Sequence, residues 1–201
     1  MQLIGLTGGI AAGKSTIGAR LSQLGAVRVD ADALAREAVA VGSPGLMRVI
    51  ERFGTEMVRA DGSLDRAALG AVVFGDAAAL GDLNSIVHPE VRRLFRERVE
   101  QAQAENPAAI VVYEVPLLAE TVARDEPWDL IVVAEADAET RVERMVGLRG
   151  MSEESARQRI ANQGDDAQRR EIADVVIDTS GTLEQSLAQA DRLWHGLLSR
   201  G

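Results

Sequence analysis

The chain has 201 residues, of which 46% are apolar and 26% charged, and it carries a formal net charge of −9 and no cysteine. This composition suits a globular domain and excludes disulfides, thiolate chemistry and cysteine-based zinc sites, while the acidic balance argues against nonspecific nucleic-acid binding. No apolar run approaches the ~18 residues of a membrane span, and the N-terminus has no leader-like pattern. We therefore expect a cytoplasmic monomer that binds neither nucleic acid nor a membrane.

The first element is a phosphate-binding pattern. Residues 3–7 are a short apolar run suited to a buried strand, and residues 15–24 have helical apolar spacing. Between them, Gly8-Gly9-Ile10-Ala11-Ala12-Gly13-Lys14-Ser15 matches G-x-x-x-x-G-K-[ST]. In this setting, backbone N–H groups and a helix N-terminus converge on phosphate oxygens. Lys14 is the only lysine of the chain, and a planar guanidinium would replace its compact ammonium poorly. The motif predicts nucleotide binding but does not distinguish a kinase from a GTPase or an ATPase.

The second expected strand, residues 26–30, ends in Asp30-Ala31-Asp32. Ligands of parallel sheets bind at the carboxyl ends of the strands, so we expect this pair beside the phosphate loop. A carboxylate there can accept a hydroxyl proton or support Mg²⁺ through water. Asp30 also suits a helix N-cap, so its role stays open between capping and metal support, whereas Asp32 favours a functional role.

About 80 residues separate Asp30 from the next strand, far more than one crossover needs. Their patterns predict helices over residues 31–39, 45–53, 63–74, 76–86 and 89–103. Pro89 is expected to open the last of these at its first position. The segment is interpreted as a helical insertion that holds a second substrate.

Further strands are predicted at 109–113, 130–134 and 175–177, and a terminal helix at 183–198. The segment 138–173 is rich in arginine and glutamate and resembles a lid. The fold class expected is α/β, a P-loop NTPase-type three-layer sandwich with a parallel five-stranded sheet, a helical substrate insertion and a helical lid. The predicted domains are a nucleotide-binding core (1–30, 106–137 and 174–201), the insertion (31–105) and the lid (138–173).

Elimination narrows the class of phosphate-loop protein. A regulatory GTPase reads guanine with Asn-Lys-x-Asp, and the only lysine is already in the loop. Motor and transporter ATPases end a strand in an aspartate-glutamate pair, whereas the third strand here ends Tyr113-Glu114-Val115-Pro116. A small-molecule kinase remains.

Over nearly its full length the chain resembles the dephospho-CoA kinase family. The resemblance rests on six elements: residues 4–10 running into Gly13-Lys14-Ser15, Asp30-Ala31-Asp32 with Ala35-Arg36-Glu37, 83–89 with His88-Pro89, Val115-Pro116-Leu117-Leu118 with Glu120, the arginine segment 141–149, and 173–178. It implies that ATP phosphorylates the ribose 3′-hydroxyl of dephospho-CoA, the last step of coenzyme A synthesis.

The resemblance also implies roles for individual residues. The ATP-binding set is Gly9, Ile10, Ala11, Ala12, Gly13, Lys14, Ser15 and Thr16 with Arg141 and Arg144 of the lid, and Ser15 would ligate Mg²⁺. The catalytic set is Lys14, Arg144 and Asp32, the last as general base. The acceptor-binding set is Asp32, Arg36, His88, Arg92, Pro116, Leu117 and Leu118. From the residues alone, His88 is equally explained as a helix-entry residue and Pro116 as a strand breaker.

Two further functions stay open at this point. One is another P-loop small-molecule kinase, with a nucleoside monophosphate or a sugar acid as acceptor. The other is a non-catalytic protein that binds nucleotide. The chain also departs from the family pattern, since Ala119 stands where phenylalanine is frequent and Thr179 where asparagine is common.

Overall fold

The computed structural model describes residues 1–116, 118, 126–163 and 166–199, and the chain divides into two compact units. The first unit contains Met1–Asp30 and Ala102–Gly201, and the second contains Ala31–Gln101. The expected lid segment therefore belongs to the first unit. Among the described residues, no helix is long and apolar enough to cross a membrane.

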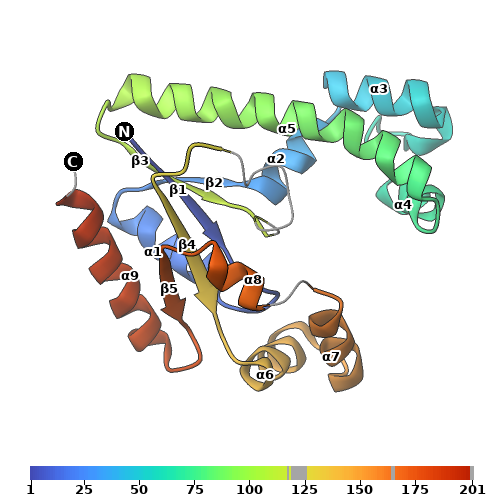
Figure 1. Cartoon of the computed structure of the whole chain (residues 1–201). Helices are drawn as coiled ribbons and strands as arrows, with labels where there is room; N and C mark the ends of the chain where they lie inside the picture. The colour runs from blue at the N-terminus through green and yellow to red at the C-terminus, as the bar shows by residue number, and fades with distance from the viewer. Residues whose placement is uncertain (117, 119–125, 164–165, 200–201) are drawn as a thin grey trace. The chain divides into compact units, whose positions relative to one another are not determined.

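A parallel five-stranded sheet forms the centre of the first unit, in the order β2-β3-β1-β4-β5 (Figure 1). The strands are β1 (Gln2–Thr7), β2 (Val27–Asp30), β3 (Ile110–Glu114), β4 (Leu130–Glu135) and β5 (Val175–Asp178). The central strands are buried on both faces, which is why they read as continuous apolar runs. The predicted parallel α/β sheet is confirmed.

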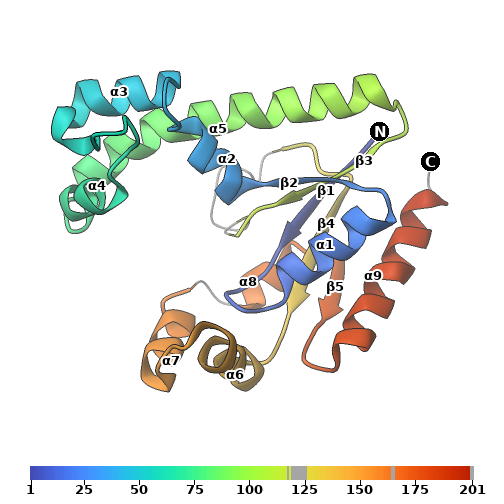
Figure 2. The same cartoon turned by 180° about the vertical axis from the view of Figure 1, so that it is seen from behind.

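Five helices lie wholly within the described part of this unit: α1 (Lys14–Leu24), α6 (Ala138–Arg149), α7 (Glu153–Ala161), α8 (Asp166–Glu171) and α9 (Leu183–Leu198). Figures 1 and 2 show α1 and α8 on opposite faces of the sheet. Helix α1 packs against α9, where Arg20 Nε donates to Asp191 Oδ1 at 2.6 Å. Side chains of β1, β4 and these two helices share one apolar core that includes Leu6, Ile17 and Leu197.

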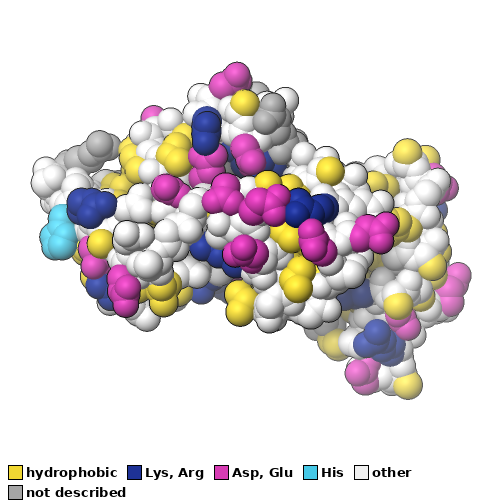
Figure 3. Space-filling model, turned by 90° about the horizontal axis from the view of Figure 1, so that it is seen from below, with side chains coloured by type: hydrophobic (Ala, Val, Ile, Leu, Met, Phe, Trp, Pro, Cys, Tyr) yellow, Lys and Arg dark blue, Asp and Glu magenta, His cyan; other side chains and the backbone are white. Residues whose placement is uncertain are grey.

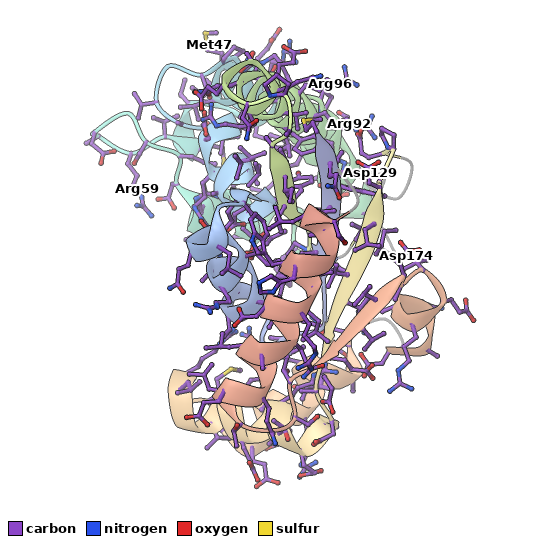
Figure 4. The ribbon with its side chains drawn as sticks, turned by 90° about the vertical axis from the view of Figure 1, so that its left-hand side faces the viewer. Met47, Arg59, Arg92, Arg96, Asp129 and Asp174 are labelled. Atoms are coloured by element: carbon purple, nitrogen blue, oxygen red, sulfur yellow. The ribbon has the colours of Figure 1, made fainter. Side chains whose placement is uncertain are left out.

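At the amino edge of the sheet, two aspartates that immediately precede strands accept backbone hydrogen bonds. Asp129 accepts a hydrogen bond from Leu3 N, and Asp174 accepts one from Ile131 N, each at 2.7 Å. Both are labelled in Figure 4. These bonds satisfy N–H groups at the start of β1 and β4, and they leave the opposite, carboxyl edge for the phosphate loop.

The second unit is helical. It contains α2 (Ala31–Ala38), α3 (Pro44–Phe53), the 3₁₀ turn Thr55–Met57, α4 (Arg66–Val73) and most of α5 (Ala77–Glu105). Ser43 and Asp65 cap α3 and α4 by accepting backbone hydrogen bonds. An apolar cluster that includes Val49, Phe53 and Leu69 gives this unit a core of its own.

The prediction of separate helices over 76–86 and 89–103 is wrong. Helix α5 runs without interruption through Pro89. Proline removes one intrahelical hydrogen bond, at a cost of about 3 kcal/mol in a helix interior. Apolar burial offsets this cost on both sides, because Ile86 and Val87 pack against the core cluster before Pro89 while Leu94 and Phe95 are buried after it.

Candidate active site

The phosphate loop joins β1 to α1 through strained backbone. Ala11 has φ +59°, the only positive value at a non-glycine residue among those described, and Gly13 has φ +82° immediately before α1. A Cβ on Gly8 would lie 2.4 Å from the carbonyl oxygen of Ala134 on β4. The loop therefore requires glycine at its first position to approach the sheet so closely.

Helix α1 begins at the motif lysine. Lys14 is half-buried, whereas Ser15 and Thr16 in the same first turn are exposed. The N-terminus of a helix presents unsatisfied N–H groups and a partial positive charge, so an anion bound in the loop is stabilised there. The local structure thus has the strand, loop and helix that the motif needs.

Four of the five strands end in a carboxylate at the loop edge of the sheet: Asp30, Glu114, Glu135 and Asp178. Arginines neutralise two of them. Arg28 Nε lies 2.6 Å from Glu114 Oε1, and Arg170 Nε lies 2.8 Å from Glu135 Oε2. The hydrogen bond to Glu114 raises the pKa of Arg28, and that to Glu135 raises the pKa of Arg170.

Two arginines of α6 reach the phosphate loop. Arg141 is 2% exposed, and its Nε donates to Ile10 O at 3.0 Å while its Nη1 lies 3.0 Å from Asp166 Oδ2. Arg144 is half-buried, and its Nη1 donates to Ala11 O at 3.2 Å. Both residues expected on the ATP side therefore lie against the loop through its carbonyl oxygens.

Two loop partners were missed by sequence reasoning. Gln163 Oε1 accepts a hydrogen bond from Ile10 N at 2.7 Å, and Thr179 Oγ1 lies 2.9 Å from Ala12 O. Thr179 directly follows β5 at the carboxyl edge, and that position is a signal that could have identified it. Nothing in the sequence around Gln163 indicates its contact.

The lid helices are held together by capping and ion pairs. Asp137 caps α6 by accepting from Thr140 N at 2.8 Å, a backbone hydrogen bond that lowers the pKa of Asp137. Arg157 of α7 bonds Glu139 of α6 at 2.8 Å and Glu153 at 2.9 Å. The hydrogen bond from Arg157 lowers the pKa of Glu139.

Figure 3 shows acidic and basic side chains intermixed on the face of the protein seen there.

The residues Pro116, Leu117 and Leu118 follow β3 in the chain. Pro116 is half-buried, and its carbonyl oxygen lies 3.4 Å from Thr7 Oγ1. Leu118 is fully buried, and a Cβ on Gly5 would lie 3.0 Å from its Cδ1. Leu117 lies outside the described residues.

The remaining acceptor candidates belong to the second unit. Asp32 is in the first turn of α2 and Arg36 in its last turn, and both are exposed. His88 and Arg92 are four residues apart on α5, so they lie on one face of that helix. The structure thus brings the phosphate loop together with Arg141 and Arg144 within the first unit.

Arg92 also lines a hollow of about 420 Å³, together with Pro89, Arg93, Arg96, Glu97 and Glu100. Figure 4 shows Arg92 and Arg96 projecting to the same side of α5. Neither forms an ion pair with a described residue, whereas Arg93 is paired with Glu90 and Glu97. Like charges one turn apart destabilise a helix by about 0.2–0.5 kcal/mol, so this pair suits an anion.

Comparison with known proteins shows which family the chain resembles. The dephospho-CoA kinase family model matches residues 2–185. A dephospho-CoA kinase of Leifsonia xyli subsp. xyli is 56% identical over 197 residues, which cover 98% of this chain and 99% of that protein. A crystal structure from Thermus thermophilus superposes with a TM-score of 0.81 at 33% identity, covering 97% of this chain and 96% of that one. A dephospho-CoA kinase from Campylobacter jejuni shares the fold, with a TM-score of 0.68 at 22% identity over 98% and 97% of the two chains.

Proposed function

The chain belongs to the dephospho-CoA kinase family and is an ATP-dependent kinase that forms coenzyme A from dephospho-CoA, and we propose that its phosphate loop binds the ATP and that Asp32 activates the acceptor hydroxyl. The observation that carries this proposal is the loop itself. It follows β1, and Lys14 and Ser15 at its end are the first two residues of α1. Arg141 and Arg144 support the same assignment, since both contact that loop.

On the ATP side, backbone N–H groups of the loop from Gly9 to Thr16 bind the phosphates, apart from those of Ile10, Ala12 and Thr16, which donate within the protein. The Lys14 ammonium neutralises charge on the β- and γ-phosphates. The Ser15 hydroxyl is an exposed hard oxygen donor, which fits Mg²⁺. No group of three acidic, histidine or cysteine side chains among the described residues could hold a metal. Mg²⁺ would therefore be held by Ser15 and phosphate oxygens, and it would neutralise developing negative charge.

In the reaction, the ribose 3′-oxygen of dephospho-CoA forms a bond to the γ-phosphorus as the bond from that phosphorus to the ADP oxygen breaks. Asp32 accepts the hydroxyl proton, and Arg144 stabilises charge on the transferred phosphoryl group. The residues proposed to hold the acceptor are Arg36, His88 and Arg92, together with Pro116, Leu117 and Leu118. Because Arg92 and Arg96 project together from α5, they suit the acceptor's diphosphate.

The test is acceptor-dependent ADP release with dephospho-CoA, adenosine, AMP, shikimate and gluconate, with the product mapped by NMR. Dephospho-CoA should be phosphorylated once, at the 3′-hydroxyl. The smaller acceptors should lose rate as well as affinity, because remote binding energy positions the reacting hydroxyl. Comparable turnover of AMP, shikimate or gluconate would instead support a kinase for a nucleoside monophosphate or a sugar acid. ATP binding without any acceptor-dependent turnover would support a non-catalytic binding protein.

A further inference from the structure

Three successive carbonyl oxygens of the phosphate loop are bonded by side chains from distant parts of the first unit. The pairs are Ile10 O with Arg141 Nε at 3.0 Å, Ala11 O with Arg144 Nη1 at 3.2 Å, and Ala12 O with Thr179 Oγ1 at 2.9 Å. Because side chains from outside the loop bond these carbonyl oxygens, they determine how the peptide planes of the loop are oriented.

The orientation of a carbonyl group determines that of the next amide. In a planar trans peptide, the C=O of one residue and the N–H of the following residue point in opposite directions. The bond to Ile10 O therefore directs the N–H of Ala11 away from Arg141, and the bond to Ala12 O directs the N–H of Gly13 away from Thr179. Convergent loop N–H groups are what bind phosphate in such a loop. The side-chain contacts thus set the direction of the binding groups.

All three guanidinium nitrogens of Arg141 take part in contacts with the loop and its neighbours. Its guanidinium, 2% exposed, bonds Ile10 O and Asp166 and lies 3.4 Å from Gln163 Oε1. The same Gln163 oxygen accepts from Ile10 N, so both backbone groups of Ile10 are bonded to this cluster. A buried guanidinium with these partners is positioned to hold the loop and has little freedom to reach a nucleotide.

Thr179 joins the loop to the sheet. Its side chain is 2% exposed, and Oγ1 lies 2.9 Å from Ala12 O and 3.0 Å from Glu135 O, so its single proton is shared between two carbonyl groups. Oγ1 also accepts from Arg144 Nη1 at 3.2 Å, and Arg144 Nη2 donates to Thr179 O. One hydroxyl thus connects the loop, the end of β4 and a lid arginine.

Apolar packing holds the same loop residues. Ile10 and Ala11 pack against the lid cluster of Val142, Met145 and Ala156. Ala11 has φ +59°, a strained conformation for a non-glycine residue that persists only where its surroundings stabilise it. The cluster and the three carbonyl bonds provide those surroundings.

We propose that Arg141 and Thr179 are positioning residues that hold the phosphate loop in its phosphate-binding conformation before ATP arrives, by bonding its carbonyl oxygens. The proposal rests on the assignment of this loop to ATP, and it gives Arg141 an indirect role in ATP binding. Arg144 also bonds the loop at Ala11 O, but it is less buried than Arg141, and it keeps its proposed role on the transferred phosphoryl group.

The first test compares Thr179→Val, which keeps the β-branched shape and loses the hydroxyl, with Thr179→Ser, which keeps the hydroxyl. MgADP binding is measured by calorimetry, and KM for each substrate by turnover. Loss of the hydroxyl that bonds Ala12 O, Glu135 O and Arg144 should weaken MgADP binding and raise KM for ATP by about 10-fold in Thr179→Val. Thr179→Ser should restore most of this loss, and KM for dephospho-CoA should stay unchanged in both variants.

The second test compares Arg141→Lys with Arg157→Gln. Lysine keeps the charge but cannot make the forked contacts, so Arg141→Lys should weaken MgADP binding. Arg157 is a matched control on the lid, since its ion pairs with described residues are those to Glu139 and Glu153, and Arg157→Gln should leave MgADP binding unchanged. Equal losses in the two variants would mean that general lid stability, and not the loop contact, controls binding.

A third measurement needs no variant. The amides of Ile10 and Ala12 donate within the protein, to Gln163 Oε1 and Gly9 O, so their hydrogen exchange in the wild-type protein should already be slow without nucleotide and should change little with MgADP. Free exchange in the absence of nucleotide, or Thr179→Val binding MgADP as tightly as the wild type, would overturn the proposal. Failure of the wild-type protein itself to bind MgADP would instead contradict the assignment of the loop to ATP, so the two failures are distinguishable.

Discussion

Glu114, the last residue of β3, accepts a hydrogen bond from Arg28 Nε at 2.6 Å while its own side chain is 2% exposed. This buried carboxylate lies beneath α1, because a Cβ on Gly18 would come within 1.7 Å of Glu114 Oε1. Gly18 is one turn after Lys14 on α1, so it lies on the same face of the helix as the motif lysine. The ion pair and the missing side chain together allow the start of α1 to approach the end of β3.

Gly18→Ala should therefore destabilise the protein by about 1–3 kcal/mol, the usual cost of overpacking a filled site. Urea unfolding measures this loss. In a Glu114→Ala background the same substitution should cost much less, because the clashing carboxylate is gone, and the double-mutant cycle reports that coupling. Gly147→Ala on α6 is the control, since a Cβ there meets nothing within 4 Å. Alanine should be neutral or stabilising there, and equal losses at both glycines would contradict the clash.

Lys14→Ala should reduce kcat/KM by about 10³-fold or more, because its ammonium stabilises charge on the transferred phosphoryl group. Lys14→Arg should not restore the rate, since a planar guanidinium does not fit the place of a compact ammonium. Steady-state ADP release measures both variants. Near-normal turnover by either one would overturn the assignment of Lys14.

Asp32→Asn keeps the shape of the side chain and removes the base, so kcat should fall far more than ATP affinity does. Turnover at saturating substrates and MgATP binding by calorimetry separate the two effects. Asp61→Asn is a matched control, because Asp61 is an exposed carboxylate that accepts hydrogen bonds from Ser63. If Asp32→Asn lost ATP binding but kept its rate at saturation, Asp32 would be a metal or structural residue.

The lid should gain hydrogen-exchange protection when both substrates bind, because closure excludes water from the transferred phosphoryl group. We expect the gain within residues 138–173 to be largest in α7. Helix α6 is already bonded to the phosphate loop through Arg141 and Arg144, so its protection should change less. Equal protection of α7 with and without substrates would contradict closure.

The cap on α6 should make lid stability depend on pH. The pKa of Asp137 is lowered by its hydrogen bond from Thr140 N, so its contribution is fully present above the unfolded pKa of about 3.9 and is lost as pH falls through the folded pKa. Asp137→Ala should lower the local stability of α6 at pH 7, measured by hydrogen exchange. The difference from wild type should shrink at acid pH. Asp137→Asn keeps a capping oxygen that does not titrate, so its stability should lack this step.

The phosphate loop, the parallel strands and the kinase class were predictable because each rests on a contiguous pattern. A motif from Gly8 to Ser15, preceded by an apolar strand and followed by a helix, specifies phosphate binding through local backbone geometry alone. Helix α5 was predicted as two helices because Pro89 is unfavourable locally, whereas tertiary packing on both sides of it stabilises a single helix. Local propensity therefore predicted the presence of helix in this region but not its continuity.

The sequence by itself determined the kinase family, and it predicts Lys14, Ser15 and Asp32 as the residues that bind and transfer phosphate. Only the tertiary structure decided what holds the phosphate loop in place. Arg141 meets Ile10 across 131 residues of sequence, and Thr179 meets Ala12 across 167. Such contacts depend on how β4, β5 and α6 pack around β1, and no local pattern encodes the direction in which a buried arginine or threonine donates its hydrogen bonds.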